Sequence, residues 1–170
     1  MKKVFAFAVL LVLLFPLHSQ AQSITDTTHV SNLQKSRAAA KTLLSTLRIL
    51  LAKELTKSGA VHAINVCADS AQDIGKRIQL QHGLSIRRVS EKWRNPNDKP
   101  DRYESAQLKI LAEFHAKNKL TDTLEVYGVM KEDSVRVFRY MRPILVGEMC
   151  LSCHGSREKM KDLIYSAVRS

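Results

Sequence analysis

Five consecutive residues near the C-terminus, from Cys150 to His154, have the types and spacing to do chemistry. They read Cys-Leu-Ser-Cys-His, the C-x-x-C-H pattern typical of covalent c-type haem attachment. Each thiol would add to one haem vinyl group as a thioether, and two intervening residues let both sulfurs reach the same porphyrin edge. His154 then lies under the ring, where its imidazole can bind the iron. The pattern predicts one covalently attached haem c.

Two other uses of a Cys-x-x-Cys pair fit the chain less well. A structural zinc site normally needs four ligands, often from two such pairs, and the chain has only three cysteines. A thioredoxin-like pair would open a helix after a strand in a βαβ unit, and no such unit is evident around Cys150.

The N-terminus predicts export. Lys2 and Lys3 form a positive start, residues 4–15 are apolar, and Ser19-Gln20-Ala21 offers small residues for cleavage. We therefore expect a signal peptide over residues 1–21 and a periplasmic or otherwise exported protein. The alternative, an uncleaved membrane anchor, is disfavoured because the apolar run is short and ends at Pro16. No stable membrane insertion is expected after cleavage. Export agrees with the haem prediction, since bacteria attach c-type haem outside the cytoplasmic membrane.

Length and charge narrow the function further. Removal of residues 1–21 leaves 149 residues, enough for one domain with its own core. The formal charge is +11 for the whole chain and +9 without Lys2 and Lys3. Such a charge suits nucleic acid, an anionic membrane surface or an acidic redox partner. Export argues against nucleic acid, and no Lys/Arg block is concentrated enough to define a docking site.

Hydrophobic spacing predicts helices followed by a small antiparallel sheet, an α+β fold with a long N-terminal helix. A capping pattern at Ser31 begins an amphipathic helix that ends near Gly59. Residues 22–58 form the lead and this helix, and residues 59–170 form the haem domain. Before the first helix we expect a flexible lead over 22–30. After it we expect a helix over 60–81, a β-prone run over 84–90, a loop over 92–101 and a capped helix from Asp101. Two strands should follow, over 123–130 and 134–146, with a turn at 131–133 and an interruption near Pro143, and then a final helix over 156–168 that turns Met160, Leu163, Ile164 and Ala167 inward.

Cys67 is left over once the haem motif is counted. It lies on the apolar stripe of the helix over 60–81, with Ala63 and Ala71 one turn away on either side. The pattern alone favours a buried cysteine that behaves as a small hydrophobe. The alternative is an iron ligand from the side of the haem opposite His154.

Several stretches together resemble a bacterial single-haem c-type protein family with a PAS-like fold. The similarity covers roughly residues 60–155. It rests on Ile64-Asn65-Val66-Cys67 with Ala71, Ile86-Arg87-Arg88-Val89-Ser90, Arg94-Asn95-Pro96, Pro100-Asp101, Tyr103-Glu104, Tyr140, Pro143-Ile144, and Cys150 to Gly155.

The resemblance implies a PAS-like antiparallel sheet flanked by helices, with haem c held covalently by Cys150 and Cys153. It also implies that Cys67 is the second axial ligand, opposite His154, which shifts the balance at Cys67 towards ligation. Alternative ligands are Met130, Met141, Met149, His62, His82 and His115.

Three arginines are candidates for contact with the haem propionates, namely Arg87, Arg88 and Arg94. Surface solvation or pairing with carboxylates is an equally good interpretation of each.

The expected function is one-electron transfer to a separate redox partner protein. A haem-based redox or gas sensor that acts through another protein is the alternative, and fold alone does not decide between them. An enzyme such as a peroxidase is less consistent with two axial ligands, because peroxidase chemistry needs an open position on the iron. Homodimerisation through the Leu-rich first helix stays open.

Overall fold

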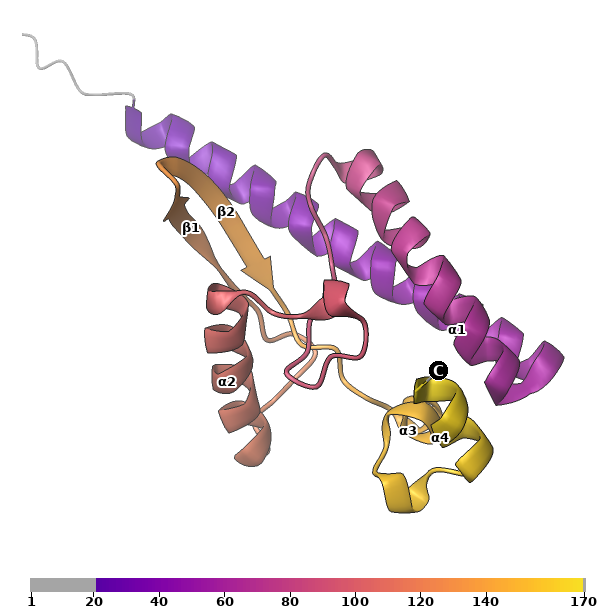
Figure 1. Ribbon diagram of the computed structural model, residues 1–170. Helices are drawn as coiled ribbons and strands as arrows, with labels where there is room; N and C mark the ends of the chain where they lie inside the picture. Colours follow the sequence, from indigo (N-terminus) through magenta and orange to yellow (C-terminus); the bar gives the residue numbers. More distant parts are fainter. Residues whose placement is uncertain (1–20, 170) are drawn as a thin grey trace, which may run out of the picture.

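The computed structural model describes residues 21–169 and consists largely of helices (Figure 1). The signal-peptide prediction falls on residues 1–20, apart from Ala21, and so lies outside the described residues. In chain order the elements are α1 (Ala21–His82), a 3₁₀ turn (Pro96–Asp98), α2 (Arg102–Ala116), β1 (Val126–Glu132), β2 (Val135–Met141), α3 (Glu148–His154), a second 3₁₀ turn (Arg157–Lys159) and α4 (Asp162–Arg169).

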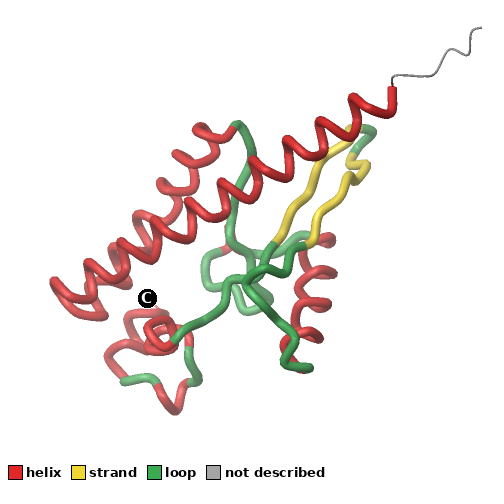
Figure 2. Tube along the Cα trace, turned by 180° about the vertical axis from the view of Figure 1, so that it is seen from behind, coloured by secondary structure: helices red, strands yellow, loops and turns green. Residues whose placement is uncertain are grey.

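A glycine turns α1 back on itself. Gly59 has φ 77° and ψ 179°, so the helix is interrupted there and its second half runs back beside the first (Figures 1 and 2). This combination of angles is open essentially only to glycine. The prediction of two helices that meet at Gly59 is confirmed. The second half ends at His82, before Gly83 at φ 63°, close to the predicted end.

The core lies between the two halves of α1. Ala39 and Leu43 from the first half form one buried cluster with Ile74 and Ile78 from the second. The two pairs lie at nearly equal separations in sequence from Gly59, which is the arrangement of an antiparallel helical hairpin. The partly buried side chains that complete this cluster are Leu47, Leu50, Leu84 and Ile86.

Residues 22–30 are helical, so the prediction of a flexible lead is wrong. The first turns of α1 lie along the β-hairpin (Figure 1), where the His29 ring centroid is 6.2 Å from that of Phe138. This polar, Thr-rich stretch is thus helical where it contacts a segment that is far away in sequence. Helix propensity, a local property, gives no information on such contacts.

β1 and β2 form an antiparallel hairpin, as predicted, with slightly different bounds. Val129 pairs with Phe138 and Glu132 with Val135. Asp133 and Ser134 both have positive φ, at 45° and 71°, as a two-residue type I′ turn requires. The expected turn at 131–133 is therefore one residue too early. β2 ends before Pro143, which confirms the interruption predicted there.

The segment between α1 and α2 contains no strand, contrary to the β-prone run expected over 84–90. Side chains nevertheless alternate between half-buried and exposed from His82 to Arg88, as in an extended chain. α2 then begins with the predicted cap. Asp101 accepts a hydrogen bond from the Glu104 N–H, and Glu104 accepts one from the Asp101 N–H, both at 2.8 Å.

α3 and α4 form a lobe at the end of the chain, and α4 packs against α1 (Figure 1). Met160 is buried, as predicted, but Leu163 is 71% exposed. α4 begins only at Asp162, and its half-buried face is formed by Ile164, Ala167 and Val168. Leu163 lies outside this face and is therefore exposed to solvent. The helices and the two-stranded sheet of the described residues confirm an α+β fold with a long N-terminal helix. No helix within residues 21–169 is both long and apolar enough to cross a membrane.

Candidate functional site

Helix α3 carries the C-x-x-C-H residues. Cys150 and Cys153 are three apart on this single short helix, so their side chains lie on the same face, and both thiols are half-buried and free. His154 is the last residue of the helix. Gly155 closes it by donating its N–H to the Leu151 carbonyl at 2.8 Å, and an added Cβ at Gly155 would collide with that same oxygen.

Cys67, on α1, lies within electrostatic range of this helix. Cys67 is half-buried on the stripe of α1 that also carries the buried Ala63 and Ala71. Burial raises the pKa of the Cys67 thiol, Arg88 opposes that effect, and Cys153 and Glu54 raise the pKa further. The electrostatic influence of Cys153 means that a cysteine of α3 and Cys67 of α1 lie in one neighbourhood, although 86 positions separate them in the chain.

Arg94 and Arg88 add positive charge to the same neighbourhood. Arg94 Nη2 donates a hydrogen bond to the Cys153 carbonyl at 3.3 Å, which ties the loop after α1 to the end of α3. Arg88 Nη2 lies 3.8 Å from Asp98 Oδ2, a long ion pair. Crowding by surrounding protein lowers the pKa of His154, and the charges of Arg94 and Arg88 lower it further. His154 therefore favours the neutral imidazole, the form that binds iron.

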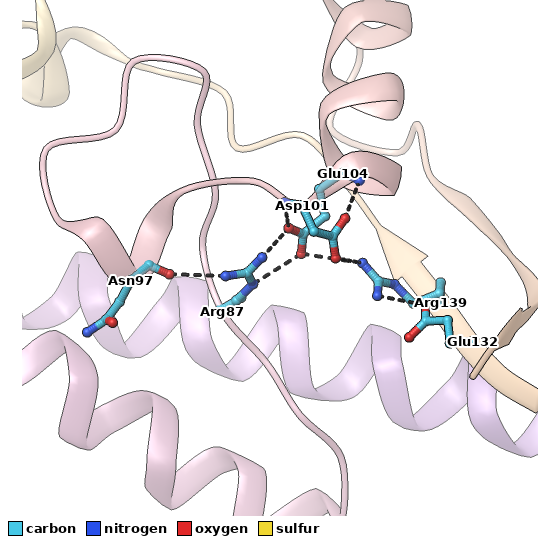
Figure 3. A network of polar contacts seen from close by, with 6 residues as sticks. All are labelled: Arg87, Asn97, Asp101, Glu104, Glu132 and Arg139. Atoms are coloured by element: carbon cyan, nitrogen blue, oxygen red, sulfur yellow. Dashed lines mark hydrogen bonds and ion pairs between the residues drawn. The ribbon is translucent and has the colours of Figure 1, made fainter. Parts of the chain in front are cut away.

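Arg87 points elsewhere. Its Nε donates to Glu104 Oε1 at 3.1 Å, its Nη2 makes a second bond to Glu104 Oε2, and its Nη1 donates to the Asn97 carbonyl at 3.2 Å (Figure 3). Pairing with a carboxylate was one of the two interpretations open for Arg87, and the structure shows that pairing. A propionate contact of Arg87 stays a prediction.

The alternative ligands are spread over the described chain. His82 is fifteen residues beyond Cys67 on the same helix, a distance of about 22 Å along the axis. Met130 lies on β1 and is 41% exposed, and Met141 ends β2. His62 Nε2 is engaged by Glu54 Oε2 at 3.4 Å. The remaining two are Met149 within α3 and His115 at the end of α2.

These residues have the chemistry that a c-type haem requires. Two thiols share one face of α3 with a neutral imidazole beside them, a further thiol approaches from α1, and the guanidinium groups of Arg88 and Arg94 suit carboxylates. The donor set therefore fits the group that C-x-x-C-H predicts.

Sequence reasoning missed the second role of Asp101 and Glu104. Both were identified as a helix cap, and both are also ion-pair partners of arginines from other elements, Arg87 and Arg139. The local signal was the capping pattern alone, because the two arginines are distant in sequence. The buried Glu54, which pairs with His62, was likewise not singled out.

Comparison with known proteins identifies the family. The sequence profile of the Tll0287-like family matches residues 18–168, a range that includes Cys67, the arginines and the whole C-x-x-C-H motif. Neither a curated protein nor a solved structure matches the chain. Because the match covers most of its length, the chain belongs to the Tll0287-like family.

Proposed function

We propose that this chain is an exported c-type haem protein that transfers single electrons to a separate redox partner. The observation that carries the proposal is the approach of Cys67, Arg88 and Arg94 to the helix that bears Cys150 and His154. The charged start and apolar run of residues 1–21 support export. The resemblance stated from the sequence further supports a PAS-like fold for the complete haem-loaded protein.

Each residue has a definite task in this proposal. Cys150 and Cys153 would hold the haem through thioethers, and His154 would offer a neutral imidazole to the iron. Cys67 would offer a thiolate to the iron, which would donate electron density and stabilise the ferric state, so we expect a low reduction potential. Arg88 and Arg94 would pair with the propionates. The haem itself supplies the one-electron oxidation and reduction.

One observation supports a sensor as the second candidate. Burial raises the pKa of Cys67, so its thiolate is harder to maintain than that of an exposed cysteine. Protonation of Cys67 would release the position opposite His154 and leave it open to a diatomic gas. Such a sensor would act through a separate partner protein.

The test compares the wild type, Cys67→Ala and the control Ile74→Ala, each produced alongside a c-type haem maturation system. Ile74 lies on the same buried stripe and offers no ligand atom, so its variant reports a packing defect alone. We expect a thiolate-type ferric spectrum that only Cys67→Ala loses, and a reversible one-electron couple. Identical spectra for all three proteins would contradict ligation by Cys67. Binding of carbon monoxide with loss of the thiolate would favour the sensor.

A further inference from the structure

The β-hairpin leaves the outer edge of β1 open. β2 packs against α1, whereas β1 lies on the side of β2 that faces away from α1, at the margin of the molecule (Figure 1). In the sheet of the described residues, β1 pairs with β2 alone. An open edge presents unpaired backbone N–H and C=O groups, and these groups can pair with a strand from another chain.

The register of the hairpin identifies the groups that point outward. Glu132 and Val135 flank the two-residue turn, so their backbones are hydrogen-bonded to each other. Bonded and non-bonded pairs then alternate along an antiparallel ladder. The N–H and C=O groups of Tyr127, Val129 and Lys131 therefore point away from β2. In the described chain, none of these three residues makes a backbone hydrogen bond outside the hairpin.

The outward groups are symmetric about Val129, the middle residue of β1. Two antiparallel copies of β1 that meet at Val129 would place Tyr127 of each copy opposite Lys131 of the other. Every outward group then has a partner, in three pairs that each form two hydrogen bonds. A shift by two residues would leave only two such pairs. A shift by one residue would place the outward groups opposite groups that are already bonded to β2.

The charges on β1 suit the same register. Lys131 would face Tyr127 and Glu132 would face Val126, so no like charges lie directly opposite each other along the strand. Tyr127 is 49% exposed, which leaves its ring available to the ammonium group of Lys131 as a cation–π partner.

The shapes of the side chains agree with the charges. Met130, which is 41% exposed, would face Gly128 of the other copy. A Cβ added at Gly128 would meet no atom within 4 Å, so there is room beside this glycine for a long side chain. An edge that matches itself in bonds, charge and shape favours a second copy of this chain over an unrelated strand, because a two-fold contact uses every match twice.

We propose that two copies of this chain associate through β1 and join their hairpins into one four-stranded antiparallel sheet, in the order β2–β1–β1–β2. A two-stranded sheet is small, and additional strands increase its stability. The contact lies on the hairpin and does not use the Leu-rich face of the first helix. The proposal goes beyond the haem function and does not depend on it.

The first test measures the mass of the wild type, Val129→Pro and Arg136→Pro by analytical ultracentrifugation, with and without attached haem. Both residues carry an outward N–H in a non-bonded pair, but Val129 lies on the edge of β1 and Arg136 on the edge of β2. Proline removes that N–H and leaves the hydrogen bonds between β1 and β2 in place. We expect dimers for the wild type and Arg136→Pro, and monomers for Val129→Pro.

A monomeric wild type would overturn the proposal, as would a dimer that Val129→Pro leaves intact. Circular dichroism establishes whether each proline variant is folded. If Val129→Pro is unfolded, the two tests that follow decide the matter, because neither changes the backbone.

The second test compares the dimer dissociation constants of Tyr127→Lys and Tyr127→Glu. Both variants lose the stacking of Tyr127 on Phe138, whose ring centroids are 6.3 Å apart, so a packing defect affects them alike. In the dimer, the first sets a lysine opposite Lys131 at both ends of the contact, and the second sets a carboxylate there. We expect Tyr127→Glu to dimerise about tenfold more tightly than Tyr127→Lys. Equal constants, or the reverse order, would contradict the proposal.

The third test determines the register by disulfide cross-linking in Cys67→Ser/Cys150→Ser/Cys153→Ser protein, in which an introduced cysteine is the only thiol. In Val129→Cys the two Cα atoms would be about 5.5 Å apart, within disulfide range. In Lys131→Cys the thiols would be separated by four residues along the strands, or about 13 Å, which is too far for a disulfide.

We expect mild oxidation to cross-link Val129→Cys and to leave Lys131→Cys as single chains. Lys131 is the more exposed of the two residues, so random collision would favour cross-linking at Lys131. Faster cross-linking of Lys131→Cys would therefore overturn the proposal.

These tests separate failure of this inference from failure of the proposed function. Dimers through β1 in a chain that never acquires haem would support the inference and contradict the haem proposal. A haem-loaded protein that stays monomeric would do the reverse.

Discussion

Replacement of Gly59 by alanine should destabilise the protein through the backbone alone. A Cβ added at Gly59 would meet no atom within 4 Å, so no clash contributes. The cost arises because φ 77° with ψ 179° is a conformation that residues with a side chain rarely adopt, at about 1 to 3 kcal/mol. Alanine also restricts the unfolded chain, which offsets about 0.4 to 1 kcal/mol. We expect a net loss of about 1 to 2 kcal/mol in the free energy of unfolding.

The change should also weaken the arrangement of the site. Alanine favours a continuous helix at this position, and a straight α1 would separate Ala39 and Leu43 from Ile74 and Ile78, the residues of the buried cluster. Cys67 lies in the second half and would move with it. Loss of about 1 to 2 kcal/mol corresponds to a melting temperature lower by about 2 to 8 °C for a domain of this size.

The assay is chemical and thermal unfolding followed by far-UV circular dichroism. Gly83→Ala is the matched control, because Gly83 has φ 63° and is equally free of steric contacts, but caps the end of α1 instead of reversing the chain. We expect its loss of stability to be smaller. A Gly59→Ala protein as stable as the wild type would refute the idea that Gly59 fixes the helical hairpin.

Three further predictions concern Tyr140 and the ionic contacts of the hairpin. Tyr140→Phe removes a 3.0 Å hydrogen bond to Glu125 and should lower the free energy of unfolding in urea by about 1 to 2 kcal/mol; an unchanged midpoint would show that water replaces the bond. Burial of Tyr140, together with this hydrogen bond, raises its pKa to about 12. The wild-type phenol should therefore stay protonated in titrations to pH 11. The hydrogen bond from Arg37 lowers the pKa of Glu125. Burial alone would raise the pKa of Asp101, but hydrogen bonds from the Glu104 N–H and from Arg139 outweigh burial and lower it. Both carboxylates have a lower pKa in the folded state than in the unfolded state. Their contribution to the free energy of unfolding is therefore complete above the unfolded-state pKa values of about 4, and it is lost as the pH falls through the folded-state pKa values. Stability should therefore decline below about pH 4, and less so in Glu125→Gln; a flat profile from pH 6 to pH 3 would contradict this.

Much of the fold follows from local patterns. Gly59 and the two apolar stripes predict the helical hairpin, and the Asp101–Glu104 pair predicts the start of α2. The sequence does not predict helix over residues 22–30, because the partner of His29 is Phe138, from the distant β-hairpin. Nor does the sequence predict that residues 84–90 form no strand.

The candidate site divides in the same way. C-x-x-C-H is a local motif, and the stripe on α1 alone suffices to turn Cys67 inward. The pairing of Arg87 with Glu104 and the hydrogen bond from Arg94 to the Cys153 carbonyl are tertiary contacts, which no local pattern signals. Two consecutive arginines predict positive charge, but they do not predict which way each side chain points.

The most direct test of the central claim is the intact mass of the chain produced with a c-type haem maturation system, together with a pyridine haemochrome spectrum. The account predicts a mass increase of one haem that survives denaturation, the spectrum of a haem with two thioethers, and loss of both in Cys150→Ser/Cys153→Ser. A mature chain of unmodified mass, under conditions that load a control cytochrome, would contradict it.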